Sequence, residues 1–202
     1  MAVEAGAAAL GLVSRMPSGP GVISDERIAE IAATVPPAIG TFLLTSCQSV
    51  AEIVEQQHFC RTNTIQICDH LLHGTHRELK QALPGISIVQ VVHVAGPESV
   101  EEAAALTGVD AILLDSGNQK LKVKELGGTG RTHDWSLSRA IRDRIQVPMF
   151  LAGGLTSENV SRAIREVGPF GLDVCSSVRT NGKLDPQKLT EFIRNANTES
   201  HA

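Results

Sequence analysis

Residues 151–160, which read LAGGLTSENV, place a short apolar run directly before two glycines and the start of a helix. Glycine lets backbone N–H groups approach an anion closely, and the N-terminus of a helix adds a favourable dipole. The alternative interpretation is a tight turn that needs glycine for its backbone angles. Strand, turn and helix in this order form a unit, and its recurrence along the chain decides the predicted fold.

The same unit recurs from one end of the sequence to the other. Seven short runs are apolar without strict alternation, as expected when both faces of a parallel sheet are buried. The predicted strands are 10–13, 39–44, 64–68, 86–92, 111–114, 149–151 and 172–174. Between them, helical patterns begin after Ser24 and at Ser49, Thr75, Pro97, Asp134, Thr156 and Asp185, and an eighth helix is predicted at residues 2–9.

Seven strands with eight helices predict a TIM-type (β/α)8 barrel whose first strand is missing from this chain. We expect residues 1–202 to form a single barrel domain that is incomplete at its N-terminus. Either the natural start lies upstream or the protein lacks that strand. A doubly wound open sheet is the alternative fold, because strand–helix alternation also permits it.

Composition narrows the classes of function. The net charge of −4 provides no basic field for nucleic acid, and a chain with one Trp and no Tyr has few rings for stacking on bases. No apolar run reaches the ~18 residues of a membrane span. The four cysteines form no C-x-x-C pair, which favours a reducing cytoplasm. Monomer and homodimer both remain open.

Residues 173–182, which read DVCSSVRTNG, follow the last predicted strand. Ser176 and Ser177 offer amides and hydroxyls there, and loops after the last two strands of such barrels commonly bind phosphate. Together with Gly153 and Gly154 they predict a site for a small phosphorylated substrate. Arg179 either adds charge to this site or is solvated on the surface, and the surface is favoured.

Asp115 ends an apolar strand, so we expect its carboxylate to point into the mouth of the barrel as a catalytic acid. The alternative is a loop-initiating aspartate that caps local amides. The long loop that follows contains Gly128, Gly130 and Arg131, a possible substrate loop. A histidine series at positions 70, 73 and 76 favours a polar loop, and no metal site is predicted.

These segments resemble the phosphoribosylanthranilate isomerase family of tryptophan biosynthesis. The resemblance rests on residues 110–116 (DAILLDS), 127–135 (GGTGRTHDW), 151–160 and 173–178, and it runs from about residue 4 to the last helix. It implies an Amadori aldose–ketose isomerisation of N-(5-phosphoribosyl)anthranilate without a metal or an organic cofactor. In this family an acid, here Asp115, protonates the ring oxygen, a base takes the proton from C2, and amides around Gly153, Gly154, Ser176 and Ser177 hold the phosphate.

The sequence departs from the family pattern at the other end of the substrate. The family's general base is a cysteine that ends the first strand, and this sequence has no such cysteine. Gly21 stands where the family has an arginine that helps to hold the anthranilate carboxylate. Cys175, Ser177 and Arg179 replace the family's serine, glycine and glutamate. Three hypotheses stay open: this isomerase, a phosphosugar-binding barrel without catalysis, and an isomerase for another phosphosugar amine.

Overall fold

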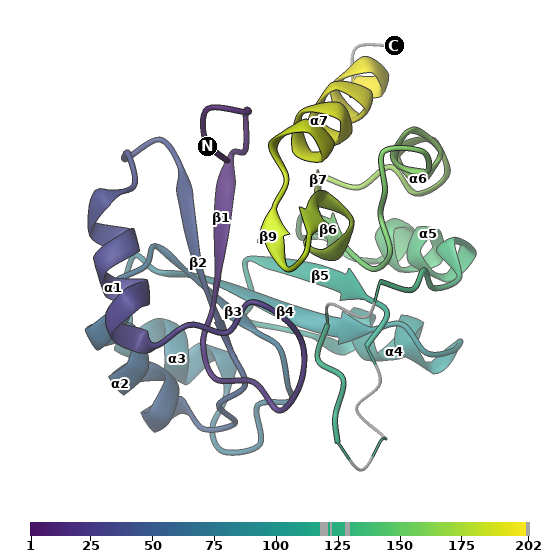
Figure 1. Cartoon of the computed structure of the whole chain (residues 1–202). Helices are drawn as coiled ribbons and strands as arrows, with labels where there is room; N and C mark the ends of the chain where they lie inside the picture. The colour runs from purple at the N-terminus through teal and green to yellow at the C-terminus, as the bar shows by residue number, and fades with distance from the viewer. Residues whose placement is uncertain (118–120, 122, 128–129, 201–202) are drawn as a thin grey trace.

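The computed structural model describes the whole chain except residues 118–120, 122, 128–129 and 201–202. Seven parallel strands pair in chain order and form one curled sheet (Figure 1). They are β1 Ala9–Val13, β2 Gly40–Thr45, β3 Thr64–Ile67, β4 Ser87–His93, β5 Ala111–Asp115, β6 Met149–Leu151 and β7 Gly171–Leu172. All seven predicted strands are confirmed, and their unbroken order contradicts the doubly wound alternative.

The sheet is open, because no pairing among the described residues joins β1 to β7. A short antiparallel hairpin, β8 Arg179–Thr180 with β9 Lys183–Leu184, follows a 3-10 turn, η1 Ser176–Val178. In Figure 1, β9 lies between β1 and β6. The observed fold is therefore an α/β fold whose main sheet has seven parallel strands and an open seam, whereas a closed eight-stranded barrel has no seam.

Seven α-helices follow the strands and cover the outer face of the sheet (Figure 1). They are α1 Asp25–Thr34, α2 Val50–Cys60, α3 His76–Ala82, α4 Glu98–Ala105, α5 Trp135–Arg144, α6 Val160–Val167 and α7 Pro186–Ser200. The predicted caps Ser24, Ser49 and Thr75 each accept a hydrogen bond from the backbone amide three residues further on. α6 begins later than predicted, because residues 156–159 form a hydrogen-bonded turn before it.

The predicted helix at residues 2–9 is wrong. The structure has hydrogen-bonded turns there, and the strand begins at Ala9. Gly6 has a φ of +101°, which interrupts a right-handed helix, and so few residues rarely form a stable helix on their own. The turns pack against the last helix instead, since a Cβ on Gly6 would lie 3.6 Å from Ile193 Cγ2.

Alternation along the strands sorts side chains between two layers of core. One cluster joins the sheet to the helices and includes Ile112 and Leu114 of β5. A second cluster, inside the curl, includes Ala111 and Leu113 of the same strand. Because successive side chains of a strand point to opposite faces, Asp115 falls on the inner face at the C-terminal end of β5. In the described part of the chain no helix is long and apolar enough to cross a membrane.

Candidate functional site

One pocket opens at the C-terminal ends of β5, β6 and β7. Its lining residues are Asp115, Gly130, Ala152, Gly153, Gly154, Leu155, Asp173, Val174, Cys175 and Ser176. The structure therefore brings the predicted acid together with three of the four residues predicted to bind phosphate. The fourth, Ser177, donates a 2.5 Å hydrogen bond from its hydroxyl to the carbonyl of Leu155, and so ties the loops after β6 and β7 to each other.

Asp115 occupies the floor of this pocket and is 7% exposed. Its Oδ1 accepts a 2.7 Å hydrogen bond from the Ser116 amide, so the carboxylate also caps its own loop as the alternative interpretation proposed. The long loop closes over the other oxygen. Gly127 has a φ of +132°, and a Cβ at this position would lie 2.6 Å from Asp115 Oδ2. Position 127 thus requires glycine both for its backbone angle and for the space beside the acid.

The two glycines after β6 are held equally closely. Gly153 has a φ of +83°, and a Cβ on it would lie 3.1 Å from Nδ1 of His133 and from the Ser116 amide. Gly154 has a φ of +60°, and a Cβ there would lie 2.5 Å from the carbonyl carbon of Arg131. Burial lowers the pKa of His133, although the negative charges of Asp115 and Asp134 act in the opposite direction. Backbone therefore lines this part of the pocket, as phosphate binding by amides requires.

The three residues predicted to form a substrate loop differ in where the structure places them. Gly130 lines the pocket with a φ of +69° and lies beside Ser176, whose Oγ would be 3.6 Å from a Cβ on it. Arg131 is exposed and forms an ion pair with Glu125. Gly128 lies outside the described residues.

The prediction of site residues missed a second carboxylate, Asp173, which lines the same pocket. Its pKa is raised to about 6, first because the surrounding protein removes water from the carboxylate and then because Asp115 is negative. The Asp173 residue is exposed at the mouth of the pocket. The surrounding pocket walls nevertheless keep water away from part of its carboxylate. Its position directly after the last strand, like that of Asp115 at the end of β5, was the signal in the sequence.

The cysteines near the pocket are thiols and not thiolates at neutral pH. Burial raises the pKa of Cys175, although the neighbouring Arg179 acts in the opposite direction. Burial also raises the pKa of Cys68, which is 2% exposed on the inner face of the sheet, and the charge of Asp115 adds to this effect. Neither cysteine is therefore ready to act as a base.

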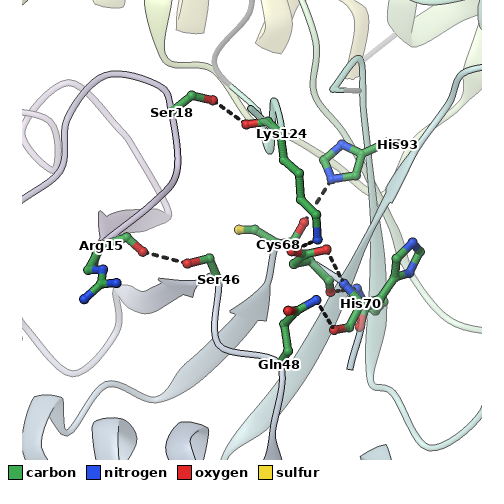
Figure 2. Close-up of polar contacts among 10 residues, drawn as sticks. Arg15, Ser18, Ser46, Gln48, Cys68, His70, His93 and Lys124 are labelled. Atoms are coloured by element: carbon green, nitrogen blue, oxygen red, sulfur yellow. Dashed lines mark hydrogen bonds and ion pairs between the residues drawn. The ribbon is translucent and has the colours of Figure 1, made fainter. Parts of the chain in front are cut away.

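The opposite side of the mouth is a network of side-chain contacts (Figure 2). Lys124 of the long loop reaches 2.6 Å from Asp69 Oδ2, and its carbonyl accepts a 2.7 Å hydrogen bond from the hydroxyl of Ser18. The ring of His93, at the end of β4, bonds to the carbonyl of Cys68 at 2.9 Å. These contacts hold the long loop down on the loops after β1 and β3.

The histidines that follow β3 do not gather around a common site. His76 bonds through Nε2 to the side chain of Gln90 at 2.9 Å, while His70 accepts a 3.4 Å hydrogen bond from Gln48 at its backbone carbonyl. Within the described part of the chain, no three or more His, Cys, Asp or Glu side chains are grouped to hold a metal ion.

Fold and pocket together define a class: α/β proteins that bind a ligand at the carboxyl ends of parallel strands, with a backbone-lined subsite beside an acidic one. Comparison with known proteins narrows the class. The family model of N-(5'phosphoribosyl)anthranilate (PRA) isomerase matches residues 1–195, and the chain belongs to this family.

Individual relatives agree with the family match. The N-(5'-phosphoribosyl)anthranilate isomerase of Haloarcula marismortui is 37% identical over 96% of this chain and 88% of its own length. The crystal structure of phosphoribosyl anthranilate isomerase from Thermotoga maritima superposes with a TM-score of 0.80 at 30% identity, covering 98% of this chain and 91% of that one.

Two further solved structures describe a ligand and an assembly. A phosphoribosyl anthranilate isomerase in complex with reduced 1-(o-carboxyphenylamino)-1-deoxyribulose 5-phosphate has a TM-score of 0.77 at 29% identity, over 98% of this chain and 91% of that one. A structure of monomers generated from the dimeric Thermotoga maritima enzyme has a TM-score of 0.77 at 28% identity, with the same coverage.

Proposed function

We propose that this chain catalyses the Amadori isomerisation of N-(5-phosphoribosyl)anthranilate in cytoplasmic tryptophan biosynthesis, with Asp115 as the general acid. The observation that carries the proposal is that Asp115 lines the same pocket as Gly153, Gly154 and Ser176. Membership of the isomerase family supports it, as does the carboxyphenylamino ribulose phosphate bound by a structural relative. The reaction converts an aldose to a ketose and, as in the family, uses neither metal nor organic cofactor.

The proposal extends to the architecture and the assembly. Residues 1–202 form one domain of the (β/α)8 type, in which the seam between β1 and β7 is the place of the remaining strand. The α/β fold and the order of its strands support this assignment. The domain acts on a small phosphorylated substrate, as a monomer or a homodimer.

Phosphate binding positions the substrate. Amides at Gly153, Gly154 and Ser176 hold the phosphate, with the dipole at the start of α6 adding to the attraction. The ribose then lies over Asp115, and this orientation lowers the barrier before any proton moves.

Two proton transfers follow from the paired carboxylates. Asp115 gives its proton to the ring oxygen, the bond from C1 to that oxygen breaks, and the nitrogen lone pair forms the imine. A base then removes the proton from C2 and gives an enol amine, which becomes the ketone when C1 takes up a proton and the C2 hydroxyl releases one. Asp173 is this base, because its carboxylate lines the same pocket, whereas burial holds Cys175 as a thiol. Below about pH 6 Asp173 is protonated in the free protein, so this assignment requires that Asp115 holds the proton when the substrate is bound.

The purified chain tests this proposal through the loss of substrate fluorescence as phosphoribosylanthranilate is consumed. We expect turnover by the wild-type chain, and losses of about 10²–10⁴-fold in Asp115→Asn and Asp173→Asn. Turnover that continues unchanged in Asp173→Asn would remove that residue from the base step. Absence of turnover in the wild type would reject the isomerase assignment.

A second candidate function is phosphosugar binding without catalysis. One observation favours it: Gly21 stands where the resemblance to the family implies an arginine. Titration of the wild-type chain with the reduced carboxyphenylamino ribulose phosphate separates the two. Binding without turnover of the substrate selects this candidate, and turnover excludes it.

A further inference from the structure

The guanidinium of Arg179 lies directly against Gly21, a residue far away in sequence. Gly21 has a φ of +86°, and a Cβ on it would lie 3.3 Å from Nη2 of Arg179. Gly21 sits at the mouth, since Val22 bridges to Val13 at the end of β1. Arg179 opens the hairpin that follows β7. The contact therefore crosses the open seam at the end of the sheet where the pocket lies.

Arg179 borders the pocket and has a free charge. Its Nη1 donates a 3.0 Å hydrogen bond to the carbonyl of Gly182, which fixes the side chain without neutralising it. It is also close enough to Cys175, a pocket residue, to act on that thiol. In the described chain no carboxylate pairs with Arg179. The sequence favoured a solvated surface position for Arg179. In the structure the residue is half-buried and also faces the mouth of the pocket.

Two other cations around the mouth are already engaged. Arg131 pairs with Glu125, and Lys124 pairs with the buried Asp69. Arg15 follows β1 but points away from Lys124 and Cys68 in Figure 2. Of these four cations, Arg179 is the one that lies beside a pocket residue and has no carboxylate partner in the described chain, so it can receive an anionic group of a ligand.

The proposed substrate has two anionic groups, a phosphate at one end and an aromatic carboxylate at the other. The resemblance to the family places an arginine at position 21 and a glutamate at position 179, whereas this chain has Gly21 and Arg179. Residues 21 and 179 are in contact. The loop at residue 21 therefore lacks the cation that the family has there, and the hairpin at residue 179 provides a cation at the same place.

We infer that Arg179 is the specificity-determining residue that binds the anthranilate carboxylate in this protein, and that Gly21 leaves the space for its guanidinium. The planar guanidinium can form two parallel hydrogen bonds to a carboxylate, which lysine cannot. The inference rests on the proposed function.

Calorimetric titration of the full chain tests the assignment without requiring turnover. The two probes are reduced 1-(o-carboxyphenylamino)-1-deoxyribulose 5-phosphate and the phenylamino analogue that lacks the carboxylate. Wild type should bind the carboxylated probe about 10- to 100-fold more tightly. Arg179→Gln should lose this preference while its Kd for the plain analogue stays unchanged, which also shows that it is folded. Arg179→Lys should keep part of the preference.

Arg139→Gln is the matched control, because Arg139 pairs with Asp143 on the outer surface of α5. It should bind both probes as the wild type does. The assignment is overturned if Arg179→Gln keeps the preference, or if it weakens both probes equally, as a merely structural residue would. Failure of the wild type to bind either probe would instead reject the proposed function, so the two failures are distinguishable.

Discussion

The two sides of the pocket mouth differ in which atoms line them, backbone on one side and side chains on the other. After β6 and β7 the pocket is lined by backbone, with Gly153 and Gly154 at positive φ and Ser177 joining the two loops. After β1 and β3 the same rim is built from side chains, with Lys124 and Asp69 at its centre.

The difference shows which part of a binding site can be relocated. An amide that holds phosphate is positioned by backbone angles, so a change of residue there disturbs the whole turn. A cation on a long side chain can be supplied from another loop, as Arg179 lies over Gly21. Changes on the two sides should therefore have different consequences.

The largest predicted effect is that of removing the acid, which should lower kcat strongly and leave ligand affinity nearly unchanged. Asp115→Asn keeps the shape of the pocket floor but cannot protonate the ring oxygen, so kcat should fall by about 10²–10⁴. Affinity for the reduced product analogue should change little, because the proposal assigns its phosphate to backbone amides and not to Asp115. Steady-state fluorescence kinetics and calorimetry measure the two effects, and an equal loss of both would contradict the division between the two sides.

The backbone side should not tolerate a single methyl group. Gly154→Ala would place a Cβ 2.5 Å from the backbone of Arg131 at a φ of +60°, so we expect KM to rise about tenfold and the free energy of unfolding to fall by about 1–3 kcal/mol. Gly85→Ala is the matched control, since Gly85 has a φ of +86° with nothing within 4 Å. It should lose stability but leave KM unchanged, and a similar KM in both variants would refute the proposed contact.

Substitutions on the rim after β1 and β3 should change the free energy of unfolding more than they change phosphate binding. Lys124→Met removes the ammonium group 2.6 Å from Asp69, which is 5% exposed, and should lower the free energy of unfolding by about 1–3 kcal/mol in urea. The lysine is 35% exposed, which limits the effect because solvent screens part of the interaction. Lys80→Met breaks a more exposed pair with Asp110 and should cost less than about 1 kcal/mol. An equal loss in both variants would mean that burial of Asp69 contributes nothing.

The smallest predicted effect is a dependence of stability on pH. The pKa of Asp173 in the folded protein is raised to about 6, above its ordinary value, so between about pH 4 and 6 the folded state holds a proton that the unfolded chain has released. Its contribution to stability is therefore present at low pH and is lost as the pH rises through 6. Asp173→Asn should flatten the stability profile in this window, and its kcat/KM should lose the rise with pH near 6. Parallel profiles for wild type and variant would disprove the assignment.

Much of the fold could be predicted because its determinants are local. Apolar runs of strand length located all seven strands, and Ser24, Ser49 and Thr75 located helix starts through bonds that span three residues. The opening helix failed because Gly6 takes a positive φ, and the alanine-rich composition around it does not show this.

The site could be predicted only where chain order and spatial order coincide. Asp115, Gly153 and Ser176 follow parallel strands, and the carboxyl ends of such strands meet at one edge. Sequence patterns do not show which loop residues meet across the mouth. The pairing of Lys124 with Asp69 depends on the path of the long loop, and the contact of Arg179 with Gly21 depends on the open seam.

The close approach of Gly127 to Asp115 has an evolutionary consequence. A side chain at position 127 would collide with Oδ2 of the acid, so selection for the acid is also selection against every other residue at that position. The two positions should drift together across relatives: lineages that abandon the acid are released to fill position 127, and lineages that retain it are not. Variation at a residue with no reactive group would then report whether the chemistry beside it is still in use.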